Sequence, residues 1–344
     1  MSKKFGFAVY VSTFEKQKLI LEKRKGRGMP VFTSLHIGEE VSDTYVTEAE
    51  AMCDWLHAND FYILADVSPY TLERFAETSL TSLAERLHID NLRLDFGFDL
   101  EELEDELKDL AMTYNASTIL GEMKTRADAS YMHNFYPRPE TGLDIALFEQ
   151  LNEEIKAIGG DILSFISGDQ DKRGPIYDGL PTLEHHRYLA PYTQFVDLVK
   201  QYKMDAVYLG DLSLSDSQLD LILTYKESGV VQLPVDLADE YEVLYEELFT
   251  VRVDSPNGLI RVQESREFAQ AGKVVTPQNT VERLRGTITM DNERYKRYSG
   301  EVQIMRADYP ADERVNVIGQ LPAEYILLLD NLNNGEQFMF VPTK

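Results

Sequence analysis

Cysteine, tryptophan and long apolar runs are scarce in this chain. Its 344 residues include one cysteine, Cys53, and one tryptophan. A disulfide framework within the chain is therefore excluded, and we expect a reducing, cytoplasmic environment. No run of about 18 apolar residues occurs, which argues against a membrane-spanning helix. The first twenty residues, MSKKFGFAVYVSTFEKQKLI, lack a small-residue cleavage site, so no secretory signal is expected.

Basic residues are also few. The chain has 34 Lys and Arg against 59 Asp and Glu, a formal net charge of −25. This balance argues against nucleic acid as a partner, because a phosphate backbone demands a basic face. The excess of acid is uneven: residues 1–249 hold 22 basic and 46 acidic residues, whereas the remainder holds 12 and 13. The step predicts two domains with different surfaces.

Short apolar segments alternate with amphipathic helical patterns through the first two-thirds of the chain. The segments read as strands that are buried on both faces, as parallel strands are. They cover residues 5–12, 31–37, 61–68, 91–98, 110–117, 132–137, 161–168 and 204–211. Eight such units, the last helix falling at 216–228, predict a (β/α)₈ barrel over residues 1–235. A doubly wound open sheet is the alternative, although the glycine-rich turn of a dinucleotide fold is missing after the first strand.

The pattern changes towards the C-terminus. Short alternating strands are separated there by turn sequences such as SPNG, DNERYKRYSG and LNNGE. We expect a small, mostly-β domain over residues 236–344.

Polar side chains stand where the barrel strands are predicted to end, which is where barrel active sites lie. They are Tyr10, Ser12, His36, Asp66, Asp95, Asn115, Asn134, Tyr136, Arg138, Ser167, Asp169 and Asp211. Such a ring suits a polyhydroxylated ligand, although several of these residues could equally cap the following helix. Asp95, in LRLDFGF, reads as part of a strand, where a carboxylate is costly unless it is paired or functional.

Two loops add candidates. In MHNFYPRPETGLD (132–144), Pro137 and Pro139 restrict the backbone around Arg138, whose guanidinium could bind a phosphate or carboxylate or form a structural salt bridge. The loop over 168–187 carries Asp178, Glu184 and the pair His185 and His186. We expect no metal site here, because adjacent histidines should point in divergent directions. A carboxylate pair drawn from this loop and a strand end is favoured, since glycoside hydrolysis needs two such groups flanking one bond.

Five stretches together carry a resemblance that covers essentially the whole chain. They are HNFYPRPETGL, GPIYDGLPTLEHHR, YLGD, RGTITMDNERYKRYSGEVQI and ERVNVIGQL. In combination they resemble the MupG-type 6-phospho-N-acetylmuramidases. The resemblance implies a TIM barrel followed by a cyclophilin-like β domain. It also implies a cytoplasmic glycosidase of cell-wall recycling, which cleaves a disaccharide of 6-phosphorylated N-acetylmuramic acid and N-acetylglucosamine.

The resemblance does not identify a catalytic pair, so we choose candidates among the carboxylates at the predicted strand ends and in the loop over 168–187. We expect Asp95 and Glu184 to supply the acid and the nucleophile or base, with Asp211 and Asp178 as alternatives; the substrate's acetamido group is a third possible nucleophile. We expect the substrate to be bound by a set of polar side chains, with the arginines on its anionic groups. They are Asn115, Asn134, Tyr136, Arg138, Tyr177 and Arg297. No cofactor or metal is expected. A non-catalytic sugar-phosphate-binding protein and a glycosidase for another 6-phosphodisaccharide remain open, and the sequence does not indicate an oligomeric state.

Overall fold

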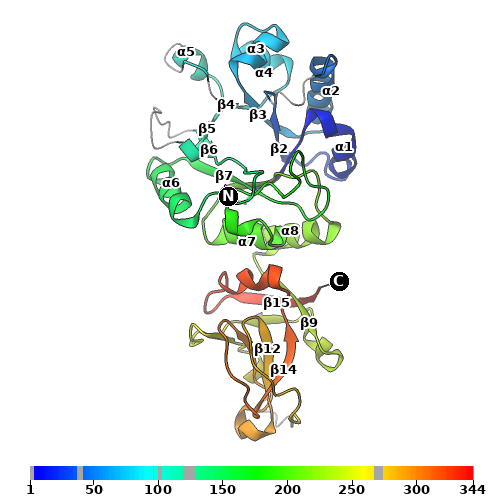
Figure 1. Cartoon of the computed structure of the whole chain (residues 1–344), viewed down its shortest axis with the longest axis vertical. Coiled ribbons are helices and arrows are strands. Elements are labelled where there is room, and N and C mark those ends of the chain that lie inside the picture. The colour runs from blue at the N-terminus through cyan, green and yellow to red at the C-terminus, as the bar shows by residue number, and fades with distance from the viewer. Residues whose placement is uncertain are drawn as a thin grey trace. The chain divides into compact units, whose positions relative to one another are not determined.

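The computed structural model describes residues 4–36, 42–95, 97–99, 103–118, 129–266 and 274–343. Contacts divide the chain into two compact units, Met1–Asp216 and Ser217–Lys344. Figure 1 shows the strands of the first unit in blue to green and those of the second in yellow-green to red.

The first unit is a closed parallel barrel, as predicted, and the open-sheet alternative is wrong. Its strands are β1 Lys4–Ala8, β2 Pro30–Ser34, β3 Tyr62–Val67, β4 Asn91–Leu94, β5 Met112–Asn115, β6 Ser130–Met132, β7 Asp161–Ile166 and β8 Ala206–Leu209. They pair in chain order, and β8 closes the barrel against β1 with Val207 opposite Phe5. Aromatic and aliphatic side chains fill the interior, among them Tyr10, Phe32, Phe165 and Tyr208.

Helical segments follow the strands. They are η1 Val11–Thr13, α1 Phe14–Glu22, α2 Tyr45–Ala58, α3 Pro69–Phe75, α4 Leu80–Arg86, α5 Glu104–Leu107, η3 Ala116–Thr118, α6 Ile145–Ala157, η4 Glu184–His186, α7 Pro191–Lys200 and α8 Asp216–Ser228. Among the residues that the structure describes, no helix is long and apolar enough to cross a lipid bilayer.

Several strands end earlier than the sequence predicts, and two of these ends matter for the site. The strand expected over 91–98 stops at Leu94, so Asp95 follows the strand and does not lie within it. Gly97 has a φ of 96°, a left-handed conformation that turns the chain away from the sheet. The strand expected over 132–137 is Ser130–Met132, and the residues after it form a loop in which the Tyr136 N–H bonds to the carbonyl of Pro181.

The second unit is mostly β, as predicted. Its strands are β9 Val231–Leu237, β10 Leu248–Thr250, β11 Leu259–Arg261, β12 Thr287–Asp291, β13 Val302–Met305, β14 Val315–Gln320 and β15 Gln337–Pro342, with 3₁₀ helices η5 Asp239–Leu244, η6 Glu293–Tyr298 and η7 Ala323–Leu329. They form a seven-stranded sheet in the order β10-β15-β9-β14-β12-β13-β11. Within this unit the amide of Gln218 on α8 donates to the hydroxyl of Tyr325, 2.6 Å away.

His133 follows β6 and is buried against α6. Its Nε2 atom lies 2.8 Å from Oδ1 of Asn152, and its ring packs on Phe148 with centroids 4.6 Å apart. Burial lowers the pKa of His133 to about 4, although the hydrogen bond to Asn152 opposes this shift.

We expect the barrel unit to lose stability at acid pH because of His133. The unfolded chain binds a proton on this imidazole below its ordinary pKa of 6.5, whereas the folded protein binds it only below about 4. The stability is therefore present above pH 6.5 and lost as the pH falls through 4, about 3 kcal/mol in all. Urea unfolding at a series of pH values, followed by Trp55 fluorescence, should show a flatter pH dependence in His133→Gln than in the wild type. The exposed His57→Gln serves as control, and equal slopes in all three proteins would contradict the assignment.

Candidate active site

A cavity of 460 Å³ opens at the carboxyl ends of the barrel strands. Its polar lining includes Ser34, His36, Asp66, Arg93, Asp95, Asn134 and Arg173, and the aromatic residues Phe135, Tyr136 and Phe165 line the same space. A smaller cavity of 270 Å³ lies at the amino ends of the strands, with Lys4, Asn91 and Asp161 in its lining. Because barrel enzymes place their chemistry at the carboxyl ends, we assign the candidate site to the cavity of 460 Å³ at those ends.

The cavity contains two carboxylates on either side of one imidazole. Nε2 of His36 lies 3.0 Å from Oδ2 of Asp95, and Nδ1 of the same ring lies 3.6 Å from Oδ2 of Asp66. One donor atom from each residue falls within 4.8 Å of the others. Asp66 is buried, whereas the side chain of Asp95 is 23% exposed, so Asp95 is the carboxylate that a substrate can reach.

Strand register explains why these groups meet. Ser34 on β2 stands opposite Asp66 on β3, and Asp66 stands opposite Arg93 on β4. His36 and Asp95 each lie two residues beyond a member of this row, at the point where their strands have ended. Three neighbouring strands therefore deliver the whole group to one place at the barrel mouth.

Arg93 connects two residues that line the cavity. This buried guanidinium donates from Nη1 to Oδ1 of Asp66 at 2.9 Å and from Nη2 to Oδ1 of Asn134 at 2.6 Å. Arg93 is not among the functional residues expected from the sequence. Its position inside the apolar strand NLRL could have indicated a role, because a charged residue is costly to bury without a partner.

The ionisable groups of this cluster shift one another's pKa values. Burial alone would lower the pKa of His36, but its hydrogen bond to Asp95 and the charges of Asp66 and Asp95 outweigh burial and raise it. Burial raises the pKa of Asp66, against the opposing charges of Arg93 and His36. The guanidinium of Arg93 and the imidazole of His36 therefore both lie against the two carboxyl groups. The three donors could contact a cation, but Arg93 already occupies Asp66 and would repel one.

Glu184 lies in a different environment from Asp95. Its carboxylate accepts from Nε and Nη2 of Arg187, at 2.7 and 2.6 Å, and from the backbone N–H groups of Glu140 and Gly142, both at 2.8 Å. A Cβ on Gly142 would lie 2.6 Å from Oε2 of Glu184, so this close approach requires glycine. The hydrogen bonds from Arg187, followed by those from the backbone, lower the pKa of Glu184 to about 2. This geometry favours a structural role for Glu184, in which its carboxylate fixes the loop after β6 as a clamp, over a role as proton donor.

Asp211 is enclosed by backbone donors. Its carboxylate accepts from the N–H groups of Gly168, Arg173 and Leu180, at 2.8, 3.0 and 3.3 Å. Burial raises its pKa and these bonds oppose the shift. The arrangement anchors the loop that follows β7, in which Asp178 is half-buried and Tyr177 is exposed.

Another cavity, of 690 Å³, adjoins the candidate site. We call the candidate site the first cavity and this one the second cavity. It lies among the loops after β1, β7 and β8 and is lined by Lys16, Lys172 and Arg173 and by the hydroxyl side chains of Ser12, Thr13 and Tyr177. The segment Arg173, Gly174 and Pro175 lines both cavities.

Comparison with known proteins identifies the family. Residues 5–223 match the family model for the N-terminal part of 6-phospho-N-acetylmuramidase, and residues 231–341 match that for its C-terminal part. The chain belongs to the 6-phospho-N-acetylmuramidase family. The family resemblance predicted from the sequence is therefore confirmed.

Two solved structures resemble this chain over nearly its full length. One is a conserved protein of unknown function from Enterococcus faecalis, with 29% identity, 98% of this chain and 96% of that chain covered, and a TM-score of 0.83. The other is an uncharacterized protein of B. cereus, with 28% identity, 99% and 100% covered, and a TM-score of 0.78. No curated protein sequence matches the chain.

Of the predicted binding residues, Asn134 and Tyr136 line the first cavity and Tyr177 lines the second. Oδ1 of Asn115 accepts the N–H of Ser117, a local turn at the start of η3. Arg138 is exposed, and its carbonyl accepts from Arg187. Arg297 belongs to the second unit, where its guanidinium stacks on Tyr298, 4.9 Å from the ring centroid.

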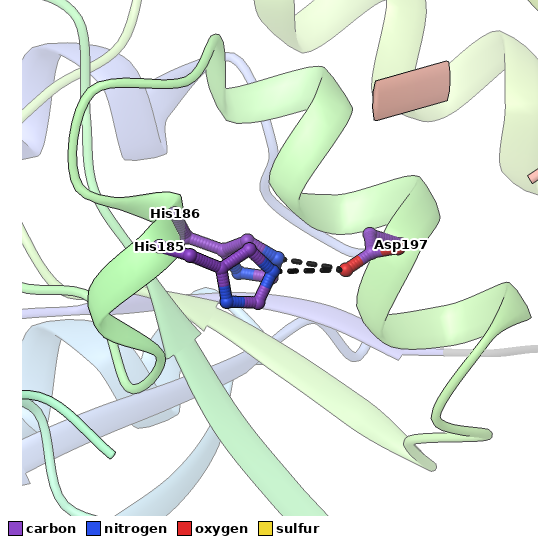
Figure 2. Close-up of side chains that lie close together, drawn as sticks. All are labelled: His185, His186 and Asp197. Carbon is purple, nitrogen blue, oxygen red and sulfur yellow. Dashed lines mark hydrogen bonds and ion pairs between the residues drawn. The ribbon is translucent and has the colours of Figure 1, made fainter. Parts of the chain in front are cut away.

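One expectation about the adjacent histidines is wrong. His185 and His186 do not diverge: both Nε2 atoms approach the same Oδ2 of Asp197 on α7, at 3.6 and 2.8 Å (Figure 2). The short 3₁₀ helix η4 brings their ring centroids to 4.2 Å from each other. These three donors could hold a divalent metal. A buried hydrogen bond from His186 to Asp197, which ties η4 to α7, accounts for the same geometry.

Proposed function

We propose that this member of the family hydrolyses the glycosidic bond between 6-phosphorylated N-acetylmuramic acid and N-acetylglucosamine, as a cytoplasmic step of cell-wall recycling. The observation that carries the proposal is the pair of carboxylates around His36 in the barrel-mouth cavity. Glycoside hydrolysis needs a carboxyl group that can exchange a proton at the bond, and Asp95 is the reachable member of this pair; the family match supplies the class of sugar.

Substrate binding would use the aromatic and amide groups of the same cavity. Tyr136 and Phe135 offer ring faces to the apolar face of a sugar. Asn134 is held by Arg93, so its amide is fixed before the substrate arrives. A side chain that is already in place loses less entropy on binding.

For the chemistry, we assign proton transfer to the Asp95–His36 pair. The raised pKa of His36 favours a proton in the pair, and exposed Asp95 can pass this proton to the leaving oxygen. Asp66 lies beyond the ring and stabilises the charged imidazole. Because these groups interact strongly, the pH profile of kcat belongs to the cluster and not to one residue.

The burial of Asp66 bears on the stereochemical outcome. Asp66 lies behind the ring of His36 and is bonded to Arg93, so Asp95 is the one of the two carboxylates that can reach the anomeric centre. The substrate's acetamido group would then act as the nucleophile. Attack by this group retains the configuration.

The purified protein should release N-acetylglucosamine and the 6-phosphomuramic sugar from the phosphorylated disaccharide, with proton NMR of the first product showing retention. Asp95→Asn protein, purified in the same way, controls for contaminating hydrolases. Binding without turnover would identify a sugar-phosphate-binding protein instead. Turnover confined to another phosphodisaccharide would reassign the substrate, and inversion would contradict the assigned geometry.

A further inference from the structure

The second cavity carries a local excess of positive charge in an acidic protein. Lys16, Lys172 and Arg173 line it together with a single acid, Asp171. The whole chain has a formal charge of −25, so three cations around one concave surface stand apart from the composition. Within the part of the chain that the structure describes, neither lysine forms an ion pair.

The position of this cavity in the barrel fits an anion. Its walls are the loops that follow β1, β7 and β8, represented by Ser12, Gln170 and Leu212. Barrel enzymes frequently bind phosphate at the loops after strands seven and eight. Hydroxyl groups of Ser12, Thr13 and Tyr177 add donors beside the ammonium groups.

Arg173 joins this cavity to the carboxylate cavity. Its guanidinium lies over the ring of Tyr10, 4.0 Å from the centroid, and its backbone N–H is fixed by Asp211. Arg173, Gly174 and Pro175 line both spaces, so the two cavities are direct neighbours at the barrel mouth.

We propose that the second cavity is the subsite for the 6-phosphate, with Lys16 and Lys172 as its specificity-determining ligands and Arg173 at the junction. This inference rests on the proposed function for the identity of the sugar. It assigns the phosphate to the loops after β1 and β7, and not to Arg138 or Arg297. The subsite is what makes the enzyme prefer a phosphorylated substrate.

The test compares Lys16→Gln, Lys172→Gln and the double variant with the wild type. Kinetics are measured on the phosphorylated disaccharide and on its unphosphorylated form. Each single variant should lower kcat/KM for the phosphorylated substrate by about 10- to 100-fold, mainly through KM, as expected for a charge-assisted contact. The ratio of kcat/KM between the two substrates should collapse in the double variant. Lys23→Gln, which removes a lysine at the end of α1, is the matched control.

Binding of inorganic phosphate separates this inference from the proposed function. Phosphate titrated into the wild-type protein and followed by ³¹P NMR should bind, and binding should be lost in the double variant. If the wild type hydrolyses neither disaccharide but shows this pattern, the proposed function fails and the anion subsite stands. If the double variant keeps full selectivity and phosphate binding, the subsite is wrong. Loss of selectivity in Arg138→Gln alone would then place the phosphate at the loop after β6.

Discussion

Asp95→Asn should lower kcat for the phosphorylated disaccharide by about 10³-fold, while the protein remains folded. General acid–base catalysis by one side chain contributes on the order of 10²–10⁴. Asn keeps the size of the side chain but cannot accept or release the proton that Asp95 shares with His36 across 3.0 Å. Circular dichroism and the urea midpoint confirm the fold, and release of N-acetylglucosamine measures kcat.

The leaving group distinguishes proton donation from other roles of Asp95. A nitrophenyl glycoside needs little protonation, so Asp95→Asn should lose far less activity on it than on the disaccharide. The exposed Asp43→Asn is the control for the loss of one acid from this unit. An equal loss on both substrates would assign Asp95 to nucleophilic attack or to orienting the acetamido group. A larger loss in Asp178→Asn than in Asp95→Asn would move the catalytic role to the loop after β7.

The barrel could be predicted from sequence because its signals are local. Each strand is a short apolar run and most are followed by an amphipathic helix, so the order of elements follows from neighbouring residues. The carboxyl ends of the strands could not be predicted as well. The run MHNFYP looks like a strand, but it leaves the sheet after Met132, and Tyr136 bonds to Pro181 in a distant loop. Such a partner is invisible to a local pattern.

The candidate site divides in the same way. Asp95, Asn134 and Tyr136 could be placed at the barrel mouth because each lies in the carboxyl-terminal part of a predicted strand. The pairing of Asp66 with Arg93 depends on the register of β3 against β4, which the sequence does not state. The second cavity combines Lys16 from α1 with Lys172 from the loop after β7, two segments that are far apart in the chain. Charge counts, which average over the whole unit, conceal such a cluster.

Glu184→Gln should destabilise the barrel unit by about 3 kcal/mol. Arg187 has no exposed side-chain surface and Glu184 is its ion-pair partner, so the substitution leaves a buried guanidinium without a counter-charge, which costs about 3–5 kcal/mol in buried pairs. The 29% exposure of Glu184 places the expected value at the lower end. Urea unfolding followed by Trp55 fluorescence measures it, because the only tryptophan lies in α2 of this unit.

A second substitution separates the clamp from a catalytic role for Glu184. Combining Glu184→Gln with Arg187→Met removes the uncompensated charge, so the double variant should recover part of the stability that the single variant loses. A carboxyl group with a pKa of about 2 is ionised near neutral pH and has no proton to donate. Glu184→Gln should therefore keep kcat within about tenfold of the wild type at temperatures where it is folded, with KM raised because the loop from Arg138 to Gly142 loses its anchor. The assignment would be reversed by a Glu184→Gln variant that is as stable as the wild type, inactive on the disaccharide and active on a nitrophenyl glycoside. Glu184 would then be the general acid, and Asp95 would be the nucleophile or base.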